Sequence, residues 1–387
     1  MRVRSGLLAA VAVFILFGCS SGSGGDSIKI GWLGALSGDN AAWGQSELNT
    51  VKMLLDDVNS KGGVSVGGKT YRFSIVSYDD RGLADEADAD VKKLAWDDKV
   101  NAIIGPAFSR EAIPVAKMVA WEKIPCIATT ATNPAVTVSN NIVNPYMFRA
   151  CFIDSYQGAV AANYAYKRLG AKTAAIFVKS DDPYSVGLGE FFNENFRWLG
   201  GKVVASVSFK ADEKDYRNEL TQIKDAKPDL VFAPVFDTDI ALAAKEARSI
   251  GLDAVMMGGD GWPSANLLTM AGNALEGCYY VNHLDVSDPA VQAYRTKYVQ
   301  TYGKEPELPG YLANDAVLML LDAIQRAQTL DGTAIAHALE SCDIQGITGH
   351  IKIGKDTHNP EGKEAAIIGI KNGKMVFVER FAATLPQ

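Results

Sequence analysis

Polar side chains that could bind a small charged molecule follow two apolar runs in the sequence. Ser109 lies in GPAFSR (105–110) just before an expected helix, where its hydroxyl either caps the helix or helps the helix N-terminus to hold an anion. Thr130 and Thr132 lie in ATTATNP (128–134), where threonines either end a strand and form a turn or offer hydroxyls to a polar ligand. These three residues are candidates for binding an anionic group.

Two later segments carry groups of complementary chemistry. Asp260 lies in MGGDGWP (257–263), where its carboxylate either forms a local turn or pairs with a ligand ammonium that the flanking glycines let approach. Tyr184 lies in KSDDPYSVG (179–187), where it either covers the surface or offers a flat apolar face and a hydroxyl. Hydroxyls and a helix N-terminus for an anion, together with an acid for a cation, match a zwitterion.

One large aromatic residue stands among small and polar ones near the start of the chain. Trp43 lies in GALSGDNAAWG (34–44), between an expected strand and an expected helix. It either packs against that helix or walls a cleft and contacts the apolar part of a ligand. Trp43 is therefore a further candidate for the binding site.

These segments lie between strands and helices that alternate along the chain, as the spacing of apolar residues indicates. Strands are expected at 28–33, 71–80, 100–106, 124–130, 173–179, 202–209, 229–235, 254–259 and 277–282. Helices are expected at 44–59, 84–97, 110–122, 155–169, 186–199, 215–225, 238–250, 263–271, 288–302, 310–328 and 333–341, and a β-rich end at 345–382. Two successive runs of this kind predict two doubly wound α/β lobes with parallel sheets. Such sheets bind ligands at the carboxyl ends of their strands, where the candidate residues lie.

Length and composition indicate a protein of two domains. A chain of 387 residues, 48% of them hydrophobic, exceeds one typical core. The formal net charge of −7 argues against a nucleic-acid binder. The sequence contains no G-x-S-x-G, no H-E-x-x-H and no paired acid with a nearby histidine, which argues against an enzyme. Because the histidines and cysteines lack ligand spacing, we expect neither a metal nor another cofactor.

The N-terminus has the order of an export signal. A basic start precedes an apolar run (7–17) that is too short to span a bilayer comfortably. The small-residue motif that ends at Cys19 resembles the lipobox of bacterial lipoproteins, which implies that residues 1–18 are removed and that Cys19 carries a lipid. Residues 19–27 then form a Ser/Gly-rich tether. A buried thiol or a failed membrane helix is the alternative.

Four further cysteines would meet an oxidising compartment after export, so disulfides are possible. They allow three full pairings, which the sequence does not separate: Cys126, Cys151, Cys278 and Cys342.

Six segments taken together resemble a known family. They are GALSGDNAAWGQSELNTVKMLLDDVNSKGGV, DDKVNAIIGPAFS, IPCIATTATNP, FRACFIDSYQG, DLVFAPVFDTDIALAAKEARSIGL and MGGDGW. In this order they look like the signature stretches of periplasmic branched-chain amino-acid-binding proteins, which are type I solute-binding proteins of ABC importers. The resemblance implies two α/β lobes joined by three hinge crossovers. It places lobe 1 at 28–148 and 283–362, and lobe 2 at 149–282 and 363–387.

The resemblance also implies roles for the polar candidates. Ser109 and Thr132 would bind the ligand carboxylate, and Thr130 would act mainly through its backbone. Tyr184 would reach the ligand from lobe 2. Asp260 would bind the ammonium at a position where the family often has Glu.

The same resemblance implies which residues surround the ligand side chain. Trp43 falls on an aromatic position of the first loop. Phe236 or Asp237 falls where the family can place a Tyr, so the side-chain pocket is expected to differ from that of a Leu/Ile/Val site.

The expected function is that of an extracytoplasmic lipoprotein that binds a small amino acid, branched-chain or otherwise apolar, by hinge closure. The protein would act as a monomer and deliver its ligand to an ABC permease in the membrane. One alternative is the same scaffold binding a solute that has no ammonium group, such as an aromatic acid, an amide or a urea-like solute. The other is an extracytoplasmic ligand sensor.

Overall fold

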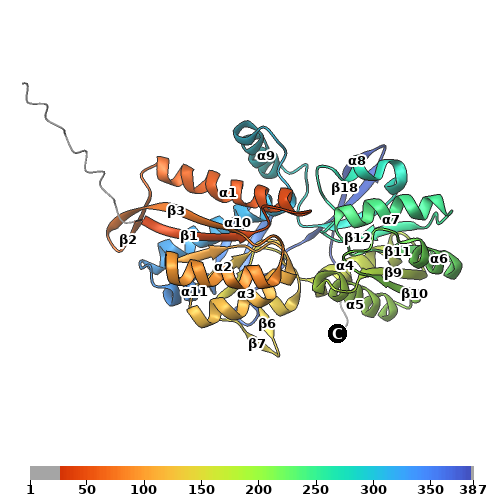
Figure 1. Ribbon diagram of the computed structural model, residues 1–387, viewed down its shortest axis with the longest axis horizontal. Coiled ribbons are helices and arrows are strands. Elements are labelled where there is room, and N and C mark those ends of the chain that lie inside the picture. The colour runs from red at the N-terminus through yellow and green to blue at the C-terminus, as the bar shows by residue number, and fades with distance from the viewer. Residues whose placement is uncertain (1–26, 385–387) are drawn as a thin grey trace, which may run out of the picture.

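Two α/β lobes, each built on one main sheet, make up the computed structural model, which describes residues 27–384 (Figure 1). The main sheet of the first lobe has the order β2-β3-β1-β4-β5-β8. β1 lies inside this sheet and is buried along most of its length because helices cover both faces. The strands are β1 (Ser27–Gly34), β2 (Val64–Val66), β3 (Lys69–Asp79), β4 (Ala102–Ile104), β5 (Cys126–Ala128) and β8 (Met147–Arg149).

In the first lobe, α2 and α3 pack together on one face of the sheet, and α1 and α10 pack together on the other (Figure 1). The helices and turns of this lobe are α1 (Ala41–Ser60), α2 (Ala84–Lys93), η1 (Leu94–Asp98), α3 (Ser109–Glu122), η2 (Pro134–Val136), α9 (Pro289–Tyr302), α10 (Leu308–Ala327) and α11 (Gly332–Leu339). Its smaller strands are β6 (Val138–Ser139), β7 (Ile142–Val143), β14 (Asp343–Gly346), β15 (Gly349–Ile353) and β16 (Pro360–Glu361). One large apolar core joins these elements.

The second lobe has a main sheet of order β10-β9-β11-β12-β13-β17-β18. Its strands are β9 (Thr173–Lys179), β10 (Lys202–Phe209), β11 (Leu230–Phe232), β12 (Val255–Gly258), β13 (Tyr279–Asn282), β17 (Ala365–Lys371) and β18 (Lys374–Phe381). Its helices are α4 (Asp154–Lys167), α5 (Pro183–Trp198), α6 (Arg217–Ala226), α7 (Asp237–Ser249), α8 (Leu267–Ala271) and η3 (Gly272–Leu275). α4 packs against α5 and α6 against α7, and a separate apolar core fills each face of the sheet.

The sheets are mixed, whereas the sequence pattern predicted parallel sheets. β2 and β3 form an antiparallel hairpin because Gly67 and Gly68 adopt positive φ angles of 57° and 80°, which suit a tight turn. At the other end of the chain, β17 pairs antiparallel with both β13 and β18. The parallel arrangement holds at the centre of both sheets, where the candidate site is formed.

Two helices begin three residues earlier than the sequence analysis predicted. α1 begins at Ala41 and α5 at Pro183, so Trp43 and Tyr184 lie in first helical turns and not in loops. In α5 the reason is local: the Asp182 carboxylate accepts a hydrogen bond from the Tyr184 N–H (3.3 Å), and a proline is favourable at the first helical position.

The chain passes between the lobes three times, after β8, after β13 and after β16, as expected for hinge crossovers. Within residues 27–384, the helices are too short or too polar to cross a bilayer. Cys126, Cys151, Cys278 and Cys342 are all buried and free, so the disulfides considered from the sequence are absent from this part of the chain. Cys19 lies outside the described residues.

Candidate ligand-binding site

A small cavity lies between the lobes at the carboxyl ends of the central strands. The first lobe contributes Trp43, Ala107, Phe108, Ser109 and Thr130, and the second contributes Tyr184, Phe236, Asp260 and Gly261. Its volume of about 10 Å³ is close to the space that one water molecule needs. A ligand of amino-acid size therefore requires some of these side chains to move apart.

Aromatic rings from both lobes form the apolar part of this cavity. The Trp43 ring stacks on Phe108, with centroids 5.5 Å apart and planes at 23°. Phe236 of the second lobe meets these two rings edge-on, at 5.9 Å and 5.2 Å. The Tyr184 ring lies 5.2 Å from Phe236. Trp43 thus contacts a ring of the opposite lobe and does more than cover its own helix.

Ser109 lines the cavity but does not cap the helix. Phe108 keeps an extended backbone and occupies the cap position, and α3 begins at Ser109 itself. The Ser109 hydroxyl instead accepts a hydrogen bond from the Asn133 N–H (3.1 Å). The Asn133 side-chain amide donates to the Pro183 carbonyl of the second lobe (2.9 Å), so this contact bridges the lobes.

The two threonines of the neighbouring segment lie in different places. The Thr130 hydroxyl lines the cavity and donates to the Ala107 carbonyl (2.8 Å). Thr132 is fully buried behind the cavity, and its hydroxyl has no hydrogen-bond partner among residues 27–384. The segment turns toward α4 here, because the Thr132 carbonyl accepts from the Asp154 N–H (2.9 Å). The structure therefore brings Thr130, and not Thr132, to the cavity wall.

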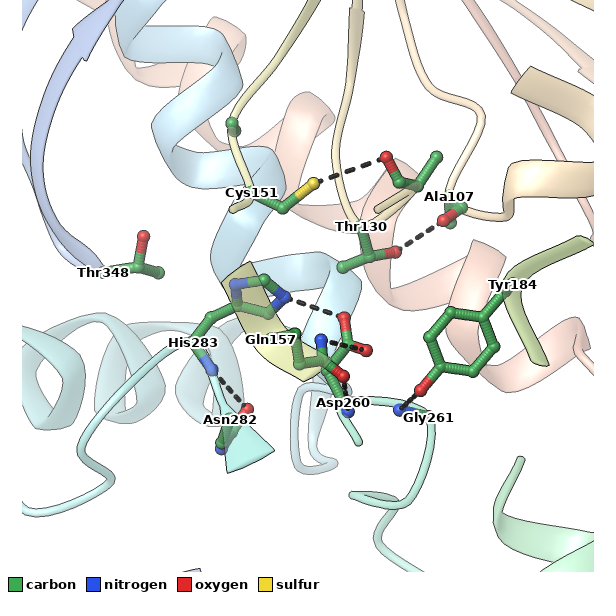
Figure 2. A network of polar contacts seen from close by, with 12 residues as sticks. Ala107, Thr130, Cys151, Gln157, Tyr184, Asp260, Gly261, Asn282, His283 and Thr348 are labelled. Atoms are coloured by element: carbon green, nitrogen blue, oxygen red, sulfur yellow. Dashed lines mark hydrogen bonds and ion pairs between the residues drawn. The ribbon is translucent and has the colours of Figure 1, made fainter. Parts of the chain in front are cut away.

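Asp260, which follows β12, is held by two side chains (Figure 2). Its Oδ1 accepts from Gln157 Nε2 of α4 (2.9 Å), and its Oδ2 lies 2.8 Å from His283 Nε2. The Asp260 N–H donates back to Gln157 Oε1 (3.3 Å). The preceding Gly259 allows this close approach, since a Cβ there would lie 2.2 Å from Gln157 Oε1. These contacts, and not a local turn, fix the Asp260 carboxylate.

Tyr184 completes this side of the cavity. Its hydroxyl accepts a hydrogen bond from the Gly261 N–H (3.0 Å), as Figure 2 shows. Burial, followed by the charge of Asp260, raises the pKa of Tyr184 well above its usual value, so the phenol stays neutral. The hydroxyl keeps a proton that can be donated to a neighbouring acceptor.

A second, larger cavity of about 320 Å³ lies between the lobes on the other side of Phe236. Its lining is mostly charged: Asp39, Asn40, Arg81, Gly82, Leu83, Arg110, Lys179, Asp181, Asp182, Ala211, Lys214, Phe236, Asp237, Thr238 and Asp239. Phe236 lines both cavities, whereas Asp237 lines only the outer one of these two. Of this pair, Phe236 is the residue that the structure brings to the inner cavity.

A group of buried carboxyl groups lies behind the first-lobe wall. Burial raises the pKa of Glu47 and of Glu111 to about 8 each, and that of Asp80 to about 6. The Thr129 hydroxyl donates to Glu47 Oε1 (2.6 Å), and Arg110 contacts Glu111 (2.8 Å). Glu47 is therefore largely uncharged at neutral pH, whereas the Arg110 charge opposes the effect of burial at Glu111.

Sequence reasoning missed Phe108, Gln157 and His283. Phe108 stands beside Ser109 in a segment already singled out, and His283 directly follows β13, so the strand-end rule could have indicated both. Gln157 lies within α4, and the sequence there carries no signal of a contact with Asp260.

The chain belongs to the periplasmic binding protein family, whose sequence model matches residues 27–374. The Leu/Ile/Val-binding protein BraC3 of Rhizobium johnstonii is 27% identical over 359 residues, which are 91% of this chain and 94% of that protein. The leucine binding protein LivK of Thermotoga maritima has a TM-score of 0.83 and 30% identity, covering 92% and 99% of the two chains. A solute binding protein of R. palustris in complex with benzoate has a TM-score of 0.81 and 22% identity, covering 94% and 98%.

These similarities confirm the predicted family and the type I fold of two α/β lobes. Membership of the family also implies an extracytoplasmic location and a role in ABC transport, and the relatives are binding proteins by name.

Proposed function

We propose that this protein is a lipid-anchored solute-binding protein that takes a small apolar or branched-chain amino acid between its lobes and delivers it to an ABC permease. The observation that carries this proposal is the composition of the inner cavity. Ser109 at the start of α3 offers a hydroxyl and a helix N-terminus, Asp260 offers a carboxylate from the opposite lobe, and aromatic rings lie between them. This order matches the carboxylate, the ammonium and the side chain of an amino acid.

In the proposed complex the ligand carboxylate meets Ser109 and the backbone near Thr130, with Thr132 supporting this segment from behind. The ammonium meets Asp260, and the Tyr184 hydroxyl lies beside it. Charge-assisted hydrogen bonds contribute about 1.5–3 kcal/mol each. A few of them together with an apolar contact on Trp43 and Phe236 reach the roughly −8 kcal/mol of a micromolar site.

Closure would follow from contacts that both lobes make at once. A ligand shifts an open–closed equilibrium through contacts that are absent from the open form. The lobes already meet through Asn133 with Pro183, and through Glu307, whose carboxylate accepts from the Ala265 N–H (3.1 Å). We place the hinges of this movement near 148–152, 281–284 and 362–363. The lipid on Cys19 would keep the protein at the membrane that holds the permease.

The direct test is mass spectrometry of the ligand that co-purifies with the protein and is released by denaturation, followed by calorimetry with leucine, isoleucine and valine. We expect an apolar amino acid and micromolar or tighter binding. Failure of all natural amino acids to bind the ligand-stripped protein would refute the proposal.

A second candidate ligand class is an aromatic acid without an ammonium group. The observation in its favour is the set of four rings around the cavity, because stacked and edge-on rings suit a flat ligand. Thermal-shift measurements with benzoate and leucine separate the two classes, since stabilisation by benzoate alone would favour the aromatic acid.

A further inference from the structure

His283 lies directly behind Asp260 and outside the cavity lining (Figure 2). Its side chain is fully buried, and its ring lies against Phe152 with centroids 3.7 Å apart. Nε2 is 2.8 Å from Asp260 Oδ2, and Nδ1 has no hydrogen-bond partner among residues 27–384. The second crossover begins here, so His283 links the end of β13 to the candidate ligand-binding carboxylate.

The hydrogen bonds around Asp260 define which atoms carry protons. Gln157 Oε1 accepts from the Asp260 N–H, so the Gln157 amide must donate its Nε2 proton to Asp260 Oδ1. His283 Nε2 faces the other carboxylate oxygen of Asp260, Oδ2. If Nε2 carries a proton, Oδ1 accepts a hydrogen bond from Gln157 and Oδ2 accepts one from His283. A second proton on the ring would then sit on Nδ1. The Asp260–His283 pair has a net charge of −1 without that proton and 0 with it.

The groups around the pair influence which charge state forms. Burial lowers the pKa of His283, Asp260 opposes this change, and the ammonium of Lys363 adds to it. Lys363 is itself buried and donates to the Ala150 carbonyl (2.7 Å) and the Thr348 hydroxyl (2.6 Å). The Asp315 carboxylate attracts this ammonium from α10.

The remaining titratable groups near Asp260 add little charge at neutral pH. Burial raises the pKa of the Cys151 thiol to about 12 and that of Asp154 well above its usual value. Tyr184 is neutral for the reason already given. His283 is therefore the group near Asp260 that can change the charge of the site, and because burial lowers its pKa, this change falls on the acidic side of the ordinary histidine range.

We propose that His283 sets the net charge of the Asp260 site and so determines whether the protein prefers a ligand with an ammonium group or one without. With neutral His283, the site is negative and attracts the ammonium of an amino acid. With protonated His283, the site is neutral and favours a carboxylic acid anion that lacks an ammonium. His283 acts through Asp260 as a positioning residue. The assignment of the ammonium to Asp260 rests on the proposed function.

The sign of the pH dependence follows from proton linkage. A ligand ammonium at Asp260 disfavours a proton on His283, so amino-acid binding expels that proton where His283 is partly protonated. The affinity then falls as the pH falls through the His283 pKa, by up to about tenfold per pH unit. An anion without an ammonium shows the opposite trend.

The test measures affinity by calorimetry from about pH 4 to about pH 8, a range extended to the acidic side because burial lowers the pKa of His283. Wild-type protein is compared with His283→Gln, whose amide keeps a donor toward Asp260 but does not titrate. His358→Asn is the matched control, because His358 is also buried, lies against Phe148 and contacts the Met147 carbonyl (3.2 Å) away from Asp260. Asparagine tolerates its positive φ of 54°.

Leucine and benzoate are both measured as probes. We expect leucine to bind wild type and the His358→Asn variant more weakly at low pH. Its affinity for His283→Gln should stay almost constant over the pH range. Calorimetry in two buffers of different ionisation enthalpy should show proton release in wild type and none in His283→Gln.

A pH-independent wild type, or an equal pH dependence in His283→Gln, would overturn the role of His283. If no amino acid binds at any pH, the proposed function fails by itself. The role of His283 is then decided by benzoate, whose affinity must rise at low pH in wild type and stay constant in His283→Gln. Absence of this difference refutes the inference.

Discussion

Each lobe places buried carboxyl groups next to the cavity, and the two groups have different partners. In the first lobe, Glu47, Asp80 and Glu111 each have one carboxyl oxygen without a hydrogen-bond partner among residues 27–384. In the second lobe, both oxygens of Asp260 are in contact with donors, Gln157 and His283. Burial without enough donors neutralises a carboxyl group, whereas donors on both oxygens stabilise its charged form.

This difference separates structural acids from one that can bind a cation. Glu47 is largely protonated at neutral pH, whereas Asp80, with a pKa of about 6, is mostly ionised, and Glu111 is paired with Arg110. These groups support the wall that carries Ser109 and Thr130. Asp260 lies at the cavity surface with a backbone fixed by Gln157. Amide substitutions on the two sides should therefore have opposite consequences.

The largest expected effect is the loss of ligand binding in Asp260→Asn and Asp260→Ala. Removing the charge that faces a ligand ammonium should lower amino-acid affinity by about thirtyfold or more, because truncating one partner of a buried charge pair costs about 2–5 kcal/mol. Calorimetry measures the affinity, and circular dichroism checks that the variants melt as folded proteins. An unchanged affinity would show that Asp260 is not the ammonium site.

The next effect concerns stability and pH. Glu47 has a pKa of about 8 when folded, against 4.5 as its ordinary value, so unfolding releases a proton between these pH values. The free energy of unfolding should fall as the pH rises through this range, by up to about 1.4 kcal/mol per unit from Glu47. This part of the slope should be absent from Glu47→Gln. The unfolding free energy of the variant, measured relative to that of wild type, should therefore be higher at about pH 8 than at about pH 5.

Urea unfolding at several pH values measures this slope. Asp253→Asn, at an exposed carboxylate, is the control and should follow wild type. Parallel curves for wild type and Glu47→Gln would contradict the view that burial keeps Glu47 protonated. Asp260→Asn should not show the gain in stability, because it removes a carboxylate that has donors on both oxygens.

A smaller effect is expected from Trp43→Ala. Removing the ring that packs on Phe108 and Phe236 takes away apolar contact area from both lobes. The affinity for leucine should drop by about tenfold, while that for glycine should change by less than about threefold. Competition binding with these two amino acids checks the difference. An equal loss for both would show that Trp43 supports the closed form without contacting the side chain.

The smallest effect is expected from Asp237→Asn. Asp237 lines the outer cavity, and Phe236 separates it from the inner one. The affinity for an apolar amino acid should change by less than about threefold, within the effect of a surface charge. If calorimetry shows that the affinity falls tenfold or more, the ligand lies in the outer cavity. The prediction that Asp237 binds the ligand would then be correct.

The sequence by itself was sufficient to predict the family, the two α/β lobes and the order of most helices and strands. These features depend on local patterns, such as the apolar runs of buried strands and the spacing along helices, and on the rule that ligands bind at strand ends. That rule led to Trp43, Ser109, Thr130, Tyr184 and Asp260, all of which line one cavity.

Only the tertiary structure decided the partners of these residues. Gln157, Asp260 and His283 come from three distant segments, and they meet because α4 packs against the ends of β12 and β13. Phe236 and Asp237 are neighbours in sequence, yet only Phe236 lines the inner cavity. A sequence pattern specifies which face of an element is buried, whereas the atom that a buried polar group contacts depends on how the elements pack together.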